Sequence, residues 1–146
     1  MTALVATEPP ATGRTLVPRI LVFSTHNISD PGVDLAGSAH MHYSPGVRVV
    51  SLPCTSGIRP KWILLAFERG FDGVFIASDG DECAYLPDCA ARSSRIVADA
   101  QSRMRERGLD PRRLRLAAIC SVCSEPFTRH VQQFSSALVD LGPVTT

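Results

Sequence analysis

The most reactive side chains of this 146-residue chain are five cysteines. Cys120 and Cys123 form a CxxC pair within the stretch ICSVCSE, and Cys54, Cys83 and Cys89 occur singly before it. Thiolates are the usual ligands of iron–sulfur clusters and of tetrahedral zinc. A CxxC pair can also act as a redox-active dithiol, and an isolated cysteine is often a small buried hydrophobic residue. Spacing alone leaves these possibilities open, so the elements that position the cysteines must decide.

The elements expected around the cysteines are short apolar strands that alternate with amphipathic helices. The run RILVFS has the composition of a strand buried on both faces, and VRVVSLP is a second run of the same kind. Pro60 and Gly70 have the positions expected at the start and the end of a helix. The expected strands are residues 19–24, 47–53, 73–78 and 114–120, and the expected helices are residues 60–70, 90–107 and 125–141.

This alternation predicts an α/β fold, a small flavodoxin-like, doubly wound parallel sheet of about four strands. The usual strand order of such a sheet is 2-1-3-4, which places the first and third strands in the centre. Residues 1–18 contain three prolines and no apolar periodicity, and we expect them to form a flexible N-terminal arm. Residues 19–146 are then expected to form a single electron-transfer-like domain.

The cysteines follow the carboxyl ends of the predicted strands. Cys54 comes directly after the second strand, and Cys83 and Cys89 follow the third. Cys120 and Cys123 lie at and just past the end of the fourth. Open α/β sheets bind their ligands at this edge, and neighbouring strands are only about 4.8 Å apart. The thiols are therefore expected to converge, on either an iron–sulfur cluster or a zinc ion.

Composition narrows the classes of partner and compartment. The formal net charge of +1 gives no electrostatic reason to expect nucleic acid as a partner. No apolar run approaches the roughly 20 residues of a membrane-spanning helix. An odd number of cysteines without a signal sequence predicts reduced thiols and a cytoplasmic location.

The acidic run of Asp79, Asp81 and Glu82 is expected to be a solvated loop rather than a cation site.

Several stretches of the chain resemble one known family. They are VDLAG at 33–37, residues 44–78, DECAY at 81–85 and GLDPRRLRLAAI at 108–119. Over about residues 19–143 the sequence resembles the delta subunit of methyl-viologen-reducing hydrogenases, also called the hydrogenase iron–sulfur subunit family. The resemblance implies a small electron-transfer protein with a [2Fe–2S] cluster. It also implies electron passage between a hydrogenase or formate dehydrogenase and a heterodisulfide-reductase-type flavoprotein.

The chain departs from that family at several of the expected cysteines. The family typically has a CxWC pair after the first strand, where this chain has FSTHNIS, and Ser78 replaces the first of two cysteines after the third strand. Cys120 and Cys123 stand where the family usually has small polar residues. The sequence is therefore interpreted as a divergent member with a relocated cluster. The expected ligands are Cys54, Cys83, Cys120 and Cys123, with Cys89 as a substitute.

Three other functions remain open. A member that has lost its cluster would act as a structural adaptor inside a redox complex. The same thiolates could instead bind zinc and stabilise the fold. Cys120 and Cys123 could also form a redox dithiol, because Pro126 can start a helix just after them and a helix N-terminus lowers a thiol pKa. The iron–sulfur electron-transfer subunit is the preferred interpretation.

Overall fold

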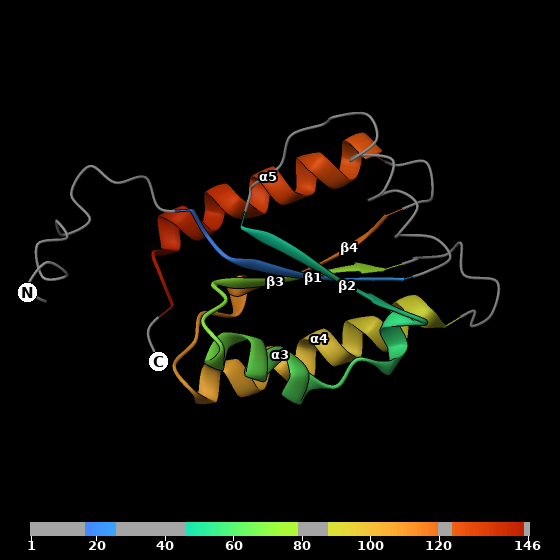
Figure 1. The fold of residues 1–146 in the computed structure, drawn as a ribbon. Coiled ribbons are helices and arrows are strands. Elements are labelled where there is room, and N and C mark those ends of the chain that lie inside the picture. Colours follow the sequence, from blue (N-terminus) through green and yellow to red (C-terminus); the bar gives the residue numbers. More distant parts are fainter. Residues whose placement is uncertain (1–16, 26–45, 79–87, 120–123, 145–146) are drawn as a thin grey trace, which may run out of the picture.

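The computed structural model describes residues 17–25, 46–78, 88–119 and 124–144, with side chains of the last helix described from Phe127 onwards. Its elements follow the predicted alternation (Figure 1). The strands are β1 (Ile20–Thr25), β2 (Val47–Leu52), β3 (Gly73–Ser78) and β4 (Leu114–Ala118). The α-helices are α3 (Pro60–Glu68), α4 (Cys89–Glu106) and α5 (Ser124–Leu141), and the 3-10 turns are η1 (Thr55–Gly57) and η3 (Pro111–Arg113).

The four strands form one parallel sheet in the order β2-β1-β3-β4. In this register Ile20 of β1 lies between Val47 of β2 and Gly73 of β3. The parallel sheet and its strand order are as the sequence predicted. Because all strands run the same way, their carboxyl ends lie along one edge of the sheet, which we call the carboxyl edge.

Helices cover both faces of the sheet (Figure 1). Helix α5 packs on one face, where the Phe75 ring of β3 meets Phe127 at 6.4 Å and Phe134 at 6.1 Å between ring centroids. Helices α3 and α4 pack on the other face through side chains that include Phe67 and Met104, both almost fully buried. Within the described residues no helix is both long and apolar enough to cross a membrane.

The prediction of a fully buried second strand is wrong. Val49 and Val50 of β2 are 39% and 40% exposed, and the remaining residues of the strand are also exposed or only partly buried. The physical reason is position, since β2 is at the end of the strand order and pairs with β1 alone. In contrast, the central strand β3 is buried along its whole length.

The helix boundaries follow the residues that the sequence singled out. Pro60 is in the first turn of α3, where its missing N–H costs no hydrogen bond. Gly70 follows α3 with a φ of +94°, and Gly142 follows α5 with a φ of +80°. Residues with side chains rarely adopt such angles, so these glycines end the helices at defined points.

Asp72, next to the amino end of β3, ties together two distant parts of the chain. Its Oδ2 accepts a hydrogen bond from the backbone N–H of Arg19 at 2.9 Å, just before β1. Its Oδ1 accepts one from the N–H of Val144 at 3.0 Å, just after α5. The segments that enter β1 and leave α5 therefore meet at the edge of the sheet opposite the carboxyl edge.

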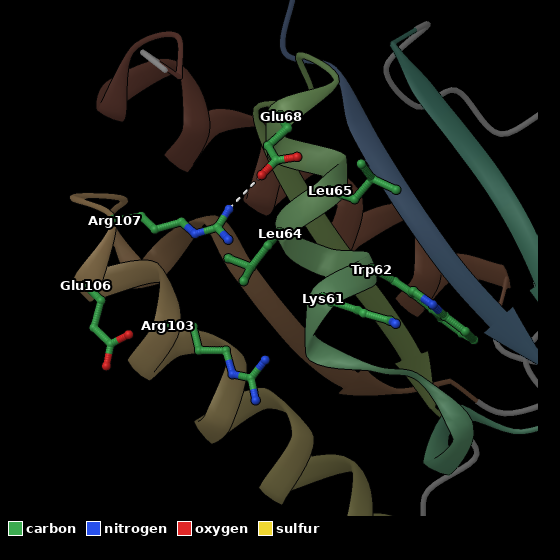
Figure 2. A pocket seen from close by; sticks show the side chains of 8 residues that line it. All are labelled: Lys61, Trp62, Leu64, Leu65, Glu68, Arg103, Glu106 and Arg107. Carbon is green, nitrogen blue, oxygen red and sulfur yellow. Dashed lines mark hydrogen bonds and ion pairs between the residues drawn. The ribbon is translucent and has the colours of Figure 1, made fainter.

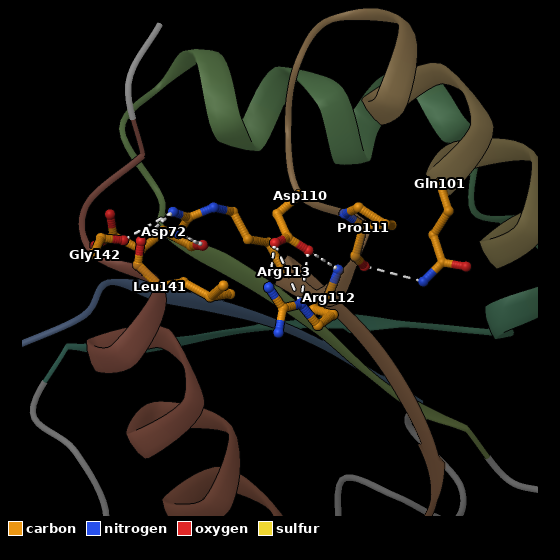
Figure 3. Close-up of polar contacts among 8 residues, drawn as sticks. All are labelled: Asp72, Gln101, Asp110, Pro111, Arg112, Arg113, Leu141 and Gly142. Carbon is orange, nitrogen blue, oxygen red and sulfur yellow. Dashed lines mark hydrogen bonds and ion pairs between the residues drawn. The ribbon is translucent and has the colours of Figure 1, made fainter.

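A buried arginine completes this junction (Figure 3). Arg113 is only 6% exposed. Its guanidinium donates hydrogen bonds to the carbonyl oxygens of Asp72 at 3.1 Å, Gly142 at 2.8 Å and Leu141 at 3.4 Å. A cation is favourable there because the carbonyls at the end of α5 carry partial negative charge. The junction fixes the end of α5 on the sheet.

Candidate functional site

Two of the cysteines predicted to form a site lie among the described residues. Cys54 follows β2 and immediately precedes η1, and Cys89 is the first residue of α4. Both are free thiols. Cys83, Cys120 and Cys123 lie outside the described residues, as does the acidic run at 79–82. The structure therefore describes one part of the predicted site.

Cys54 occupies a short loop that leaves the carboxyl edge at β2. Its backbone is extended, and its carbonyl accepts a hydrogen bond from the N–H of Gly57 at 3.2 Å, which closes the η1 turn. The Cys54 Sγ is hydrogen-bonded to the Ser56 Oγ at 2.9 Å. The residue is only partly buried.

Cys89 lies in the interior, where α4 packs on η1. The residue is fully buried, and its Sγ is 3.7 Å from the Oγ1 of Thr55. The same Thr55 oxygen is hydrogen-bonded to the Ser93 Oγ, one turn along α4, at 3.0 Å. Thr55 and Ser93 are themselves each only 1% exposed. Two hydroxyls and a thiol thus form a closed polar cluster between η1 and α4.

Thr55 connects the surroundings of the two thiols, because it follows Cys54 in the chain and its Oγ1 contacts the Cys89 Sγ. Burial is the main cause that raises the pKa of the Cys89 thiol, and the charge of Cys54 raises it further. Hydrogen bonds from Thr55 and Ser93 act in the opposite direction. Because burial disfavours the thiolate, Cys89 is protonated at neutral pH unless a metal displaces the proton.

The neighbouring strand ends carry small hydroxyl side chains. Ser24 and Thr25 end β1 and are fully buried, at the point where the resemblance leads one to expect a CxWC pair. Ser78 ends β3, and its carbonyl accepts a hydrogen bond from the N–H of Ile119 at 2.9 Å. Sheet pairing of β3 with the β4 segment thus continues up to Ile119, the residue before Cys120 in the sequence.

The described residues include two of the five cysteines. Among them, no three histidine, cysteine or acidic side chains come close enough to hold a metal ion. Cys54 and Cys89 nevertheless provide two soft sulfur donors around η1, and thiolates are the ligands that iron–sulfur clusters and zinc prefer. The pair therefore fits part of a cluster site, and further ligands would have to come from other parts of the chain.

An open groove between α3 and α4 was not predicted from the sequence (Figure 2). Its volume is about 710 Å³, and Leu64, Leu65 and Trp62 contribute apolar surface beside charged side chains. Arg107 of α4 and Glu68 of α3 form an ion pair of 2.7 Å across it. Only the amphipathic character of the two helices could have indicated it. Its lining contains no cysteine or histidine, and we assign it no chemistry.

His130 lies in α5, within the predicted helix. Its ring packs on that of Phe75 with 6.0 Å between the centroids. Burial lowers its pKa, and the positive charges of Arg115 and Arg129 lower it further. The imidazole is therefore mostly neutral at pH 7.

A family model and several known proteins match this chain. The model of the family described as methyl-viologen-reducing hydrogenase, delta subunit, matches residues 20–142. The chain belongs to this family. The match covers all the described strands and helices, and it confirms the family predicted from the sequence.

Relatives in the family occur in two contexts. The chain is 31% identical over 128 residues to one subunit of a ferredoxin:CoB-CoM heterodisulfide reductase from Methanosarcina mazei, covering 87% of this chain but 16% of that protein. It is 29% identical over 126 residues to the iron–sulfur subunit of the F420-non-reducing hydrogenase vhu from Methanopyrus kandleri, covering 86% of this chain and 95% of that protein. The corresponding iron–sulfur subunit from Methanococcus maripaludis is also 29% identical, with 94% of it covered.

Proposed function

We propose that this chain is an iron–sulfur electron-transfer subunit of a larger redox complex. The observation that carries the proposal is the position of two free thiols around η1. Cys54 comes between β2 and η1, and Cys89, the first residue of α4, contacts Thr55 of η1 at 3.7 Å. Family membership supports the same function, because relatives that align over nearly their whole length are named iron–sulfur subunits.

The proposed centre is a [2Fe–2S] cluster. Cys54 and Cys89 would provide two of the four ligands, and two of Cys83, Cys120 and Cys123 would provide the others. When bound, the cluster would supply one-electron exchange. The chain itself would exclude water around Cys89 by burial, and the hydroxyls of Thr55 and Ser93 would donate hydrogen bonds toward sulfur. Hydrogen bonds of this kind tune reduction potential.

The proposed partners follow from the two contexts of the relatives. One relative carries the matching segment within a long heterodisulfide reductase polypeptide, and others consist almost entirely of it as the iron–sulfur subunit of a hydrogenase. A domain found both fused to one component and as a separate polypeptide of another is suited to pass electrons between them. We propose a heterodisulfide-reductase-like flavoprotein as one partner, and a hydrogenase or formate dehydrogenase as the other.

Metal analysis tests the cluster. The full chain, purified without oxygen, is assayed for iron and acid-labile sulfide and examined by visible and electron-paramagnetic resonance spectroscopy. Cys54→Ser and Cys89→Ser should each lower the iron and sulfide content by more than half, because each removes a thiolate. Ser93→Ala is the matched control, since it alters the same buried cluster without removing a sulfur, and it should keep its iron. Iron below about one per chain in the unaltered protein would refute the proposal.

A cluster-free adaptor is the second candidate. It is favoured by the stretch FSTHNIS (23–29), which contains no cysteine where the family typically has a CxWC pair, and whose Ser24 and Thr25 are buried at the end of β1. An adaptor would co-purify with its complex and show no visible absorption of its own. A zinc-stabilised module, the other alternative, would contain about one zinc per chain and no labile sulfide.

A further inference from the structure

We propose that the groove between α3 and α4 is the contact surface of a symmetric homodimer, in which the same groove of a second copy of this chain packs against it. This inference goes beyond electron transfer through a cluster, because the lining of the groove contains no cysteine. Exposed apolar side chains, unpaired charges and the direction of the two helices support it.

Two large apolar side chains of α3 are exposed at the groove (Figure 2). Trp62 is 37% exposed and Leu65 is 44% exposed. Leu64, which also lines the groove, is only 4% exposed and belongs to the core beneath α3 and α4. Covering such side chains removes apolar surface from water, and aromatic residues are enriched in contact surfaces between proteins. The groove therefore offers an apolar strip on which another protein surface can pack.

The charged side chains of the groove include one cation and one anion that form no ion pair within the described part of the chain. They are Lys61 of α3 and Glu106 of α4, and both are exposed. The two arginines of the lining are already ion-paired, one across the groove at 2.7 Å and one along α4 at 3.4 Å: Arg107 with Glu68, and Arg103 with Asp99. A partner surface that complements this groove must therefore offer an anion to Lys61 and a cation to Glu106.

The two unpaired charges lie toward opposite ends of the groove. Helix α3 connects β2 to β3, and α4 connects β3 to β4. Because these strands are parallel, both helices run from the carboxyl edge back toward the opposite edge of the sheet. Lys61 is in the first turn of α3, and Glu106 is the last residue of α4. Lys61 is therefore the charge nearer the carboxyl edge.

A second copy of the chain fits this distribution of charge. In a homodimer with a twofold axis, each contact between two residues occurs twice, with the roles of the copies exchanged. An axis that crosses the groove near its middle exchanges its two ends, so Lys61 of each copy faces Glu106 of the other. Leu65, one turn along α3 from Lys61, is then covered by the second copy. The dimer gives both charges an ionic partner and removes an exposed leucine from water.

Measurement of the association state tests the proposal. The full chain is examined by sedimentation velocity over a series of concentrations, and a reversible monomer–dimer equilibrium is expected. Leu65→Glu should raise the dissociation constant at least about tenfold, because it places a charge on the apolar strip. Val139→Glu is the matched control, since Val139 is 43% exposed but belongs to α5 on the other face of the sheet. It should leave the dissociation constant unchanged.

Charge reversal tests the symmetry of the contact. Lys61→Glu and Glu106→Lys should each raise the dissociation constant of their own homodimers at least about fivefold, because each places like charges opposite one another twice. A mixture of these two variants should associate as tightly as the unaltered protein, since both contacts of the mixed dimer join a lysine to a glutamate. Asp140→Lys, on α5, changes the net charge as Glu106→Lys does. Its mixture with Lys61→Glu should associate more weakly, because one contact still joins two glutamates.

Three results would overturn the proposal. The unaltered chain would stay monomeric up to about 1 mM, Leu65→Glu and Val139→Glu would associate equally, or the two mixtures of charge variants would associate equally. All the substituted side chains are exposed, and circular dichroism checks that each variant keeps the fold. A chain that is monomeric alone and uses the groove only for a different subunit would give the first of these results. Iron content does not enter the test, so failure of the dimer and failure of the cluster are distinguishable.

Discussion

Replacement of Arg113 by methionine should destabilise the fold markedly, because this guanidinium is buried and bonded only to backbone carbonyls among its described contacts. Two of its hydrogen bonds are short, at 2.8 Å to Gly142 and 3.1 Å to Asp72, and the one to Leu141 is longer at 3.4 Å. A hydrogen bond from a charged group contributes about 1.5–3 kcal/mol. Methionine keeps most of the apolar stem but leaves these carbonyls without their donor.

The expected loss is about 3 kcal/mol of unfolding free energy. It corresponds to the two shorter bonds at the low end of that range, because removing a buried charge also removes its desolvation cost. For a domain of this size each kcal/mol shifts the thermal midpoint by roughly 2–4 °C, so a fall of about 9 °C is expected. Urea unfolding followed by circular dichroism measures the free energy, and calorimetry measures the midpoint.

The adjacent Arg112 provides the matched control. Its side chain is 75% exposed and pairs with Asp110 on the same turn. Arg112→Met removes the same charge from the preceding position of the chain, but it leaves no buried carbonyl without a hydrogen-bond donor. Its midpoint should fall far less than that of Arg113→Met, because an exposed ion pair contributes at most about 1 kcal/mol. If the two variants unfold at the same midpoint, the assignment of Arg113 as a structural anchor is wrong.

Three further outcomes are expected. Gly73→Ala should lower the free energy of unfolding by about 1–3 kcal/mol, because an added Cβ would come within 2.5 Å of Leu138 and 2.8 Å of Phe134. Gly57→Ala is the control, since the space around Gly57 is open, and it should not lower that free energy. Urea unfolding of the two variants measures both values. The carboxyl pKa of Asp110 is held at about 2 mainly by the side-chain hydrogen bonds of Arg112 and then by the backbone N–H of the same residue. In Arg112→Met this pKa should rise in an NMR titration but stay below its usual value of about 4, because the backbone N–H remains, and an unchanged value would contradict the side-chain pairing. The pKa of His130 is lowered in the fold, so on acidification the unfolded chain binds a proton at His130 before the folded chain does. The free energy of unfolding should therefore fall as the pH drops below about 6.5. His130→Gln should reduce that fall, and identical pH–stability curves for the variant and the unaltered protein would contradict this role of His130.

The sequence predicted the sheet because its strands are distinct apolar runs separated by helices with clear start and stop residues. The central strands carried the strongest signal, and β3 is buried throughout as expected. The burial of β2 was wrongly predicted from the run VRVVSLP, because valines are also common in edge strands. Whether a strand has one neighbour or two depends on the order of the whole sheet.

The position of Cys54 was predictable, but the surroundings of Cys89 were not. The sequence places Cys54 directly after an apolar run, and the structure has it at the carboxyl end of β2. The contact between Thr55 and Cys89 depends on how α4 packs on η1, and no local pattern reports that packing. Thr55 and Ser93, which lie around the Cys89 thiol, were missed for the same reason. Arg113 was missed because an arginine in a polar turn usually faces solvent.

The central claim is that cysteines at the carboxyl edge hold an iron–sulfur cluster. Its most direct test is the iron and acid-labile sulfide content of the full chain purified without oxygen, measured beside Cys54→Ser and Ser93→Ala. We expect about two irons and two sulfides per chain, as in a [2Fe–2S] cluster, and we expect them to be retained in Ser93→Ala and largely lost in Cys54→Ser. Less than about one iron per chain, or equal iron in all three proteins, would contradict it.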